Sequence, residues 1–484
     1  MNSRSKILLS IVLIKLFLLS YMVLYQGSIF SLDFIDRFKT NDYSTLLGPV
    51  NNFIETGTYE LVKNSGISFS DRLPGYMFPF IFFRFFLSEN ISIIMIIIYQ
   101  VIVSLIASYL LYEIAIRISK NFLISFSVFT IYNLISFLIP WELWTVPESL
   151  SVSYYIIALY FLYIFFYENQ SLKFIFFSGF FISMVFFLRG FLFFNIISVI
   201  IIILLSNKFS INSYKYCMIF IIPFLFFESL WIGRNYLSKD EFIPLTTFQV
   251  LNDIDLELDK NYPFDYSYKP TVLKLRKLIS SWGGVNVPYY EYSEMGFFIN
   301  NEKDITQVFP NWIFNCGISK EMLLEIQNLL LKSFDSNLSF LERCNTEKEL
   351  FNYIDFSINN FKYDSYYHSV LSSFKRLKNL IYNNIVADWP IGSFNSNSII
   401  IKIYKILILV IYFSSVLTSF FLIPFVLFKI SEYKNLFFII TLNSLLLMLV
   451  FIFIIDIAEF KYSATLFINS LLLLLLYSNK YFTN

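Results

Sequence analysis

Long apolar runs separated by short polar segments dominate this chain of 484 residues. A helix needs about 20 apolar residues to cross a hydrocarbon core of about 30 Å, and unpaired backbone groups in lipid require each crossing to be helical. The sequence therefore predicts about ten transmembrane helices. Their expected positions are 7–28, 89–116, 122–140, 150–167, 174–188, 190–206, 217–232, 399–428, 435–455 and 463–478. The fifth and sixth runs are short and meet at Arg189 and Gly190, so a broken pair with a buried junction is an alternative to two separate spans.

The spacing of the polar segments divides the chain into three parts. An N-terminal membrane module covers 1–232 and contains a long first loop at 29–88; an insert covers 233–398, and C-terminal transmembrane helices cover 399–484. Within the insert, a turn-rich first half precedes amphipathic runs. Helices are expected there at 271–281, 319–334, 338–360 and 366–387. The predicted fold class is thus an all-α polytopic membrane protein with a mainly helical extracytoplasmic domain.

The basic residues of the short loops predict the orientation of the chain. Lys and Arg occupy the N-terminal segment, alternate short loops and the C-terminal segment, whereas most acidic residues fall in the other loops. Under the positive-inside rule, both termini are cytoplasmic, and the 29–88 loop and the insert are extracytoplasmic. The first apolar run has no small-residue cleavage site after it, so we expect a retained span. The abundance of Ile, Phe, Asn and Lys indicates a bacterium, and hence its inner (cytoplasmic) membrane.

Composition narrows the class of protein further. Apolar residues make up 57% of the chain and charged residues 15%, against roughly 25% charged in soluble domains, which argues against a soluble enzyme. The net charge of +1 gives no electrostatic case for nucleic acid. Cys217, Cys316 and Cys344 match no zinc, haem or redox spacing. A disulfide between Cys316 and Cys344 stays open. Lys15, within the first apolar run, is interpreted as lipid-facing or packed, without a functional role.

Several short motifs lie on the predicted outer face. In chain order they are Asn41-Asp42-Tyr43, Gly57-Thr58-Tyr59, Asp71-Arg72-Leu73-Pro74-Gly75-Tyr76, Pro147-Glu148, Phe187-Leu188-Arg189-Gly190, Trp231-Ile232-Gly233-Arg234-Asn235-Tyr236 and Glu459-Phe460-Lys461-Tyr462. In this order they resemble the GT-C glycosyltransferases, in particular bacterial relatives of the protein O-mannosyltransferases and the lipid A aminoarabinose transferase. The resemblance implies a GT-C-like arrangement of the membrane helices.

The resemblance also implies an activity. This is transfer of one sugar, on the extracytoplasmic face, from a polyprenyl-phosphate donor to a hydroxyl of a lipid, glycan or protein acceptor. The attacking hydroxyl must lose a proton, and the leaving phosphate gains negative charge. By resemblance, Asp42 is the general base and Glu148 supports the base or the acceptor. Arg72, Arg189 and Arg234 would bind the lipid phosphate, because guanidinium groups match phosphate oxygens in geometry.

Accessory roles and structural alternatives accompany this assignment. Tyr76, Glu459, Lys461 and Tyr462 are accessory candidates, and Asp33, Asp36 and Asp71 are fallback candidates for the base. Asp42 and Glu148 could instead cap helices, and the three arginines could extend to the membrane interface without a ligand. No cofactor is assigned; a divalent metal held by oxygens of Asp42 and Glu148 stays open.

Other functions stay open as alternatives. An envelope polysaccharide (O-antigen-type) polymerase or ligase would also combine many spans, a large outer loop and arginines, with a pyrophosphate-linked donor. The early position of the 29–88 loop motifs favours the GT-C interpretation. A transporter or flippase should place ionisable residues near the bilayer midplane in paired halves, and the sequence offers few such residues. A noncatalytic sensor is a further alternative for the insert.

Overall fold

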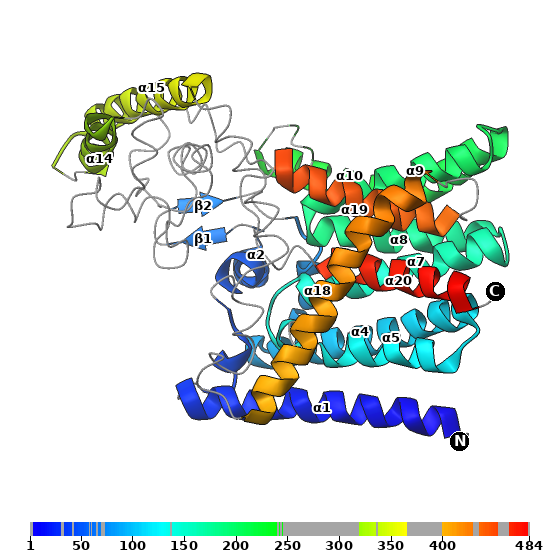
Figure 1. Ribbon diagram of the computed structural model, residues 1–484. Helices are drawn as coiled ribbons and strands as arrows, with labels where there is room; N and C mark the ends of the chain where they lie inside the picture. The colour runs from blue at the N-terminus through cyan, green and yellow to red at the C-terminus, as the bar shows by residue number, and fades with distance from the viewer. Residues whose placement is uncertain are drawn as a thin grey trace.

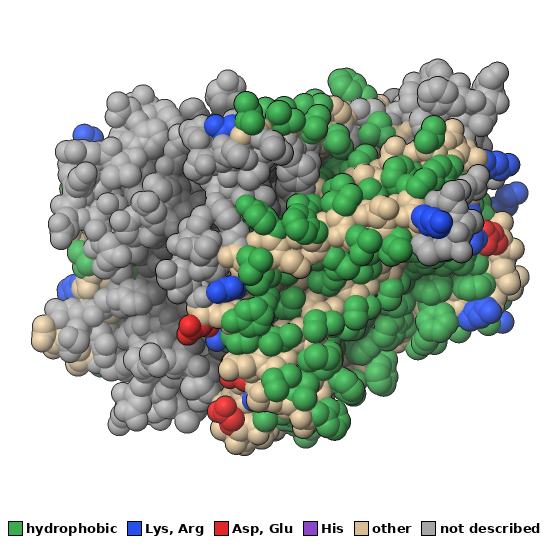
Figure 2. Space-filling model, turned by 90° about the horizontal axis from the view of Figure 1, so that it is seen from below, with side chains coloured by type: hydrophobic (Ala, Val, Ile, Leu, Met, Phe, Trp, Pro, Cys, Tyr) green, Lys and Arg blue, Asp and Glu red, His purple; other side chains and the backbone are tan. Residues whose placement is uncertain are grey.

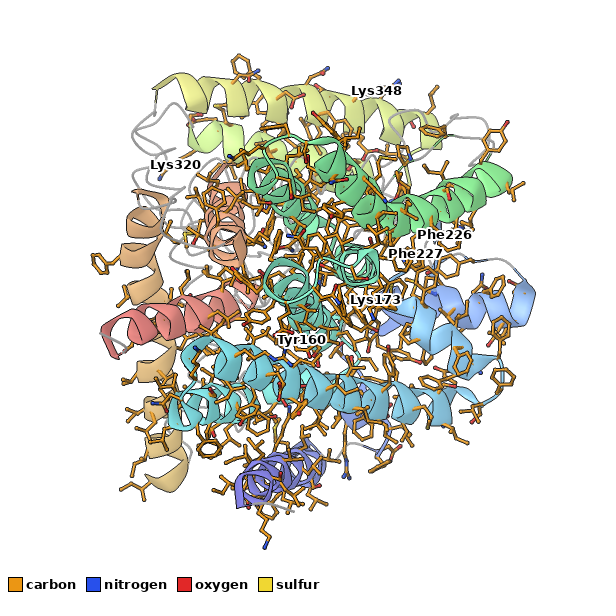
Figure 3. The ribbon with its side chains drawn as sticks, turned by 90° about the vertical axis from the view of Figure 1, so that its right-hand side faces the viewer. Tyr160, Lys173, Phe226, Phe227, Lys320 and Lys348 are labelled. Carbon is orange, nitrogen blue, oxygen red and sulfur yellow. The ribbon has the colours of Figure 1, made fainter. Side chains whose placement is uncertain are left out.

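The computed structural model describes most of the membrane module and parts of the remainder. The described residues are 3–30, 33–40, 43–57, 59, 61–63, 66–68, 73–135, 138–239, 242, 244, 319–334, 337–364, 399–428, 435–453 and 464–482. Figure 1 shows a layer of roughly parallel and antiparallel helices, with the two chain ends at the same end of the layer. Figure 3 views the molecule from that end, so helix α1 (Ser3–Phe30) is seen nearly along its axis.

The apolar runs of the sequence form helices, as predicted. Besides α1 these are α4 (Glu89–Ser119), α5 (Phe122–Leu134), α7 (Glu148–Tyr167), α8 (Leu172–Leu188), α9 (Phe194–Ser206), α10 (Ile211–Lys239), α18 (Ile399–Phe428), α19 (Asn435–Phe453) and α20 (Ala464–Phe482). Within the described residues, four segments are long and apolar enough to cross a membrane: Ser5–Leu24, Glu89–Ser119, Glu148–Tyr167 and Ile211–Leu237. Shorter apolar helices accompany them at Phe122–Leu134, Leu172–Leu188, Phe194–Ser206, Phe438–Leu449 and Thr465–Leu474.

The single span predicted at 122–140 is wrong, because the helix breaks. Helix α5 ends at Leu134, Ile135 is extended, and a separate short helix, α6 (Leu138–Leu143), follows. The side-chain amide of Gln100 donates hydrogen bonds to the backbone carbonyls of Glu142 (3.2 Å) and Trp144 (3.0 Å). These bonds satisfy carbonyl groups at the end of α6, where a helix leaves acceptors unpaired. A protein partner thus replaces water, which permits a broken helix in an apolar layer.

A second break lies at the junction between the fifth and sixth apolar runs. Helix α8 ends at Leu188, Arg189 is extended, and the 3-10 helix η2 (Gly190–Phe193) leads into α9. The Arg189 side chain is 11% exposed. The break between the fifth and sixth runs is therefore confirmed, and its junction residues Arg189 and Gly190 are partly buried.

The first loop folds into small elements at the end of the helical layer opposite the chain ends (Figure 1). It contains the 3-10 helix η1 (Asp36–Phe38), α2 (Tyr43–Thr56) and α3 (Met77–Arg84). Strands β1 (Leu61–Lys63) and β2 (Gly66–Ser68) form an antiparallel hairpin in which Val62 is paired with Ile67. The all-α prediction omitted this hairpin, which is too short to show an alternating pattern.

Helix α7 lies at the centre of the helical layer. It packs against α4, α8, α19 and α20, and most of its side chains are buried. By contrast, α1 and α4 carry exposed apolar side chains such as Phe17 and Ile102. Figure 2 views the molecule from the side on which α1 lies and shows a broad hydrophobic area with charged side chains gathered at its two ends. Such an extended apolar surface is typical of a protein surrounded by lipid.

The described part of the insert contains two helices that pack against each other, α14 (Lys320–Phe334) and α15 (Phe340–Asp364). They confirm the helices predicted at 319–334 and 338–360. Ser339 and Glu342 form a capping box: each side chain accepts a hydrogen bond from the backbone N–H of the other. The hydroxyl and the backbone N–H of Ser339 both donate to Oε2 of Glu342, and these two bonds lower the pKa of the Glu342 carboxyl because they favour its ionised form. The helices predicted at 271–281 and 366–387 lie outside the described residues.

Candidate functional site

A buried ion pair joins the start of α7 to the end of α8. The guanidinium of Arg189 donates a hydrogen bond from Nη2 to Oε1 of Glu148. The Glu148 side chain is 4% exposed and that of Arg189 is 11% exposed. Glu148 begins α7 directly after Pro147, and no side-chain hydrogen bond caps this helix. A hydrogen-bonding cap is therefore not the role of Glu148; its carboxylate balances a buried positive charge.

The turn at 73–76 in the first loop packs directly on the α8–η2 junction. The backbone N–H of Gly75 donates a hydrogen bond to the carbonyl of Phe187, at 3.1 Å. A Cβ atom at Gly75 would lie 2.3 Å from the carbonyl carbon of Phe187, so a larger residue would force the two backbones apart. A Cβ atom at Gly190 would lie 3.2 Å from Cδ1 of Leu73. Glycine thus permits close contact between two motifs that are far apart in the sequence.

Tyr76 ends this turn and lies near the ion pair. Its side chain is 1% exposed, and its hydroxyl has no hydrogen-bond partner within the described residues. Burial raises the pKa of Tyr76 well above its ordinary value, and the charge of Glu148 and the nearby Tyr43 raise it further. The Oε2 atom of Glu148 is likewise buried without a hydrogen-bond partner among the described atoms. Buried polar atoms are ordinarily paired, so this corner offers a donor and an acceptor to a polar ligand or to water.

Tyr43, the first residue of α2, belongs to the same polar region. Its hydroxyl donates a hydrogen bond to Glu89 at the start of α4. Burial raises the pKa of Tyr43, and the hydrogen bond to Glu89 raises it further. Arg84 donates to Oδ1 of Asn51, at 2.9 Å, and so ties α3 to α2. Polar contacts therefore tie α2 to both α3 and α4.

Arg234 contacts another part of the first loop. Its Nη2 donates to the backbone carbonyl of Tyr59, and Nη1 donates to Oδ1 of Asn235, at 2.7 Å. The guanidinium carbon lies 5.1 Å from the centre of the Tyr59 ring and 5.2 Å from that of Trp231, within the range of cation–π attraction. Arg234 therefore makes defined contacts, which a side chain that merely extends to the membrane interface does not require.

The structure brings some predicted site residues together and leaves others undescribed. Glu148, Arg189 and Tyr76 meet at one corner, and Arg234 contacts the same first loop through Tyr59. Asp42, Arg72, Asp71, Glu459, Lys461, Tyr462 and Cys316 lie outside the described residues, as does the side chain of Cys344. Of the fallback candidates, Asp33 is exposed, and Asp36 is 47% exposed and forms an ion pair with Lys39 at 3.0 Å. Both have the exposure expected of solvated loop charges.

Within the described residues, no group of three or more His, Cys, Asp or Glu side chains is placed to hold a metal ion. The pair of oxygens considered for a divalent metal came from Asp42 and Glu148. Only Glu148 is described, and it is paired with Arg189. A cation at this carboxylate would be repelled by the neighbouring charge of the guanidinium.

A buried polar cluster that the sequence interpretation missed lies between α1, α4 and α6. The ammonium of Lys15 lies 2.7 Å from Oε1 of Glu142 and 2.9 Å from Oγ of Ser104. Ser104 also donates to Glu142, at 2.5 Å. The side chains of Lys15 and Glu142 are 1% and 2% exposed. Of the two interpretations of Lys15, the packed one is therefore correct. The signal was a lysine in an apolar run, since a charge there is costly unless it is paired.

Comparisons with protein-family models, with curated proteins and with solved structures find no match to this chain. The class is therefore defined by the fold and the polar clusters alone. The protein is a predominantly helical molecule with membrane-spanning character, and it carries a buried ion pair beneath a folded first loop.

Proposed function

We propose that this chain is an integral-membrane glycosyltransferase that moves a sugar from a polyprenyl-phosphate donor to an acceptor hydroxyl on the extracytoplasmic face. One observation carries the proposal. The turn at 73–76 is seated on the junction at Phe187–Gly190, beside the pair of Glu148 and Arg189. Both segments were chosen from the sequence for their resemblance to GT-C motifs, and a shared site requires that they meet.

Arg189 and Arg234 would bind the phosphate of the donor, together with Arg72. A guanidinium carries several N–H donors, so an arginine that donates to Glu148 can also donate to a phosphate oxygen. At about 4 Å and an effective dielectric constant of 20, one such pair contributes on the order of 4 kcal/mol. This attraction grows as the phosphate departs with its additional negative charge, which lowers the barrier to transfer. In this scheme Glu148 holds the Arg189 guanidinium in place before the donor binds.

Asp42 would accept the proton of the attacking hydroxyl. Its neighbour in the sequence, Tyr43, is electrostatically coupled to Tyr76, which in turn is coupled to Glu148. Asp42 itself lies outside the described residues, so this role rests on the resemblance of the Asn41-Asp42-Tyr43 motif. A positioned general base contributes about 10²–10⁴-fold to the rate.

The proposed membrane topology has about ten spans in a GT-C-like arrangement, in the inner (cytoplasmic) membrane of a bacterium. Both termini would be cytoplasmic. A shared side for the two termini is supported by the start of α1 and the end of α20, which lie at one end of the helical layer, with α2, the β1–β2 hairpin, α14 and α15 at the other (Figure 1). Helix α18 crosses the other helices obliquely, and it packs against α19 and α20.

The decisive experiment uses the full chain in lipid nanodiscs with polyprenyl-phosphate-linked hexoses and pentoses as donors. The expected result is release of polyprenyl phosphate that requires an acceptor. Asp42→Asn should lower this rate by about 10²–10⁴-fold, whereas Asp36→Asn should change it less than about twofold, because Asp36 is half-exposed and paired with Lys39. Equal rates for Asp42→Asn and the unchanged chain would reject Asp42 as the base.

The same assay separates the polymerase or ligase alternative. That reaction releases a polyprenyl pyrophosphate, whereas the proposed reaction releases a monophosphate. A chain that is active only with pyrophosphate-linked donors would reject the proposed donor class. A transporter or flippase would release neither compound, and the buried pair of Lys15 and Glu142 is the observation that favours this alternative.

A further inference from the structure

The cluster of Lys15, Glu142 and Ser104 lies deep within the helical layer. Ser104 is the midpoint of α4, which runs from Glu89 to Ser119. Lys15 belongs to α1, and its ammonium also lies 5.5 Å from the centre of the Tyr132 ring. A charge at such depth is costly in lipid and is tolerated where it faces a partner inside the protein. The cluster is therefore a specific feature of this bundle, and the proposed transfer reaction makes no direct use of it.

The cluster fixes a segment that has little regular structure of its own. After α6 ends at Leu143, the chain turns through 144–147 before α7 begins at Glu148. Lys15 and Ser104 hold the side chain of Glu142, and Gln100 holds the carbonyls of Glu142 and Trp144. We call residues 142–148 the 142–148 segment. Helices α1 and α4 thus fix its inner end, at Glu142 and Trp144.

The outer end of the 142–148 segment is attached to the proposed site. The backbone N–H of Thr145 donates to the carbonyl of Phe38, at 2.9 Å, and Phe38 lies in the first loop four positions before Asp42. The last residue of the segment, Glu148, is paired with Arg189. The segment therefore connects the loop that carries Asp42 with the arginine proposed to bind phosphate. A shift at Glu142 would therefore be transmitted to the first loop and to Arg189.

We propose that Lys15 is a positioning residue: its buried ion pair with Glu142 fixes the 142–148 segment and thereby holds Glu148 against Arg189 in the geometry needed for transfer. This inference rests on the proposed function. The N–H of Trp144 still bonds to the carbonyl of Pro140, and Thr145 and Val146 are buried, but the ion pair inside the apolar layer fixes the side chain of Glu142 directly. Displacements of about 1 Å remote from the reacting atoms lower rates by about a hundredfold.

The test compares Lys15→Met, Lys15→Arg and Lys6→Met in full-length protein in nanodiscs. Lys6→Met is the matched control, because Lys6 is exposed on the same helix. With a polyprenyl-phosphate-linked hexose or pentose that the unchanged chain accepts, Lys15→Met should lower kcat at least about tenfold, with KM for the donor changed less than about twofold. Lys15→Arg preserves the ion pair and should retain about half of the activity or more. Lys6→Met should behave as the unchanged chain.

Hydrogen exchange supplies a readout that does not depend on the reaction. In Lys15→Met, faster exchange should be confined to peptides that cover 138–148 and the first loop near Phe38, with α8 and α10 unchanged. Faster exchange throughout the bundle would indicate a general loss of stability and would overturn the proposal. Unchanged kcat in Lys15→Met would overturn it as well.

Lys15→Met leaves the buried carboxylate of Glu142 uncompensated. A second variant covers the case in which the Lys15→Met protein does not accumulate. The double variant Lys15→Met with Glu142→Gln removes both charges and keeps the side-chain volumes similar. It should fold and show the same loss of kcat and the same local exchange; normal kcat in this double variant would also reject the positioning role. Absence of transfer by the unchanged chain would reject the proposed function instead, and the exchange pattern would still decide whether Lys15 fixes the segment.

Discussion

The guanidinium of Arg189 donates a hydrogen bond to the carboxylate of Glu148 across two helix ends that are 41 positions apart in the sequence. This bond places the only described carboxylate of the proposed catalytic pair beside one of the proposed phosphate-binding arginines. It also has consequences for stability, because both charges are removed from water.

We predict that Arg189→Met destabilises the protein by about 3–5 kcal/mol, because the buried carboxylate of Glu148 loses its partner. The double substitution Arg189→Met with Glu148→Gln should recover most of that loss, since no buried charge remains. Thermal unfolding of detergent-solubilised protein measures both effects. The double variant should nevertheless remain without transferase activity. A double variant as unstable as Arg189→Met would contradict this account of the pair.

We predict that Gly75→Ala abolishes transfer and lowers the thermal midpoint. The new Cβ atom would lie 2.3 Å from the Phe187 carbonyl carbon, so the turn must separate from the junction. Gly233→Ala in α10 is the matched control, because nothing lies within 4 Å of a Cβ atom there. Since alanine favours a helix by up to about 1 kcal/mol over glycine, the control should be neutral or stabilising. Equal activity of the two variants would show that the contact at Gly75 is dispensable.

We predict that Tyr155→Phe weakens the attachment of the C-terminal helices to α7. The Tyr155 hydroxyl donates to Asn469, at 2.7 Å, and accepts from Asn443, at 3.1 Å, so its removal leaves both amides short of a partner. The expected loss is about 0.6 kcal/mol, the average for hydrogen bonds between membrane helices, and at most about 1.7 kcal/mol. Tyr160→Phe on the same helix (Figure 3) keeps the ring that faces Arg117 and should change stability little. Thermal unfolding compares the two, and an equal effect would contradict the role of the hydroxyl.

We predict that the loop at 29–88 and the turn between α7 and α8 lie on opposite sides of the membrane. After replacement of Cys217, Cys316 and Cys344 by Ser, the variants Ser88→Cys and Gln170→Cys place single thiols at exposed positions. A membrane-impermeant maleimide should label Ser88→Cys in intact cells and Gln170→Cys only after permeabilisation. The reverse pattern would place the proposed site in the cytoplasm and exclude a lipid-linked donor on the outer face.

Helix bounds were well predicted where the apolar run continues to the ends of the helix. Helix α18 has the predicted bounds, and α7 begins two residues before the predicted start. Helix α10 extends beyond the predicted 217–232 at both ends, because polar residues such as Lys215 and Arg234 continue the helix outside the apolar stretch. The break between α5 and α6 was not predicted, since the run stays largely apolar through Ile139 although the helix ends at Leu134.

The proposed site was predicted in its members but not in its contacts. Glu148, Arg189, Tyr76 and Arg234 were chosen from motifs. The contact of Gly75 with Phe187 joins two of these motifs, and the ion pair of Glu148 with Arg189 joins a third. Asp42 and Arg72 stay predictions, because they lie outside the described residues. Lys15 received no role from the sequence, because its partner Glu142 lies 127 positions away.

The sequence by itself determined that this is a helical protein rich in membrane-type helices, and where most of those helices begin and end. Such information is local, because the free energy of an apolar segment in lipid depends on its own length and composition. The tertiary structure alone decided that Lys15 faces Glu142 and that Arg189 faces Glu148. Those pairs follow from how helices pack, and packing depends on many side chains at once.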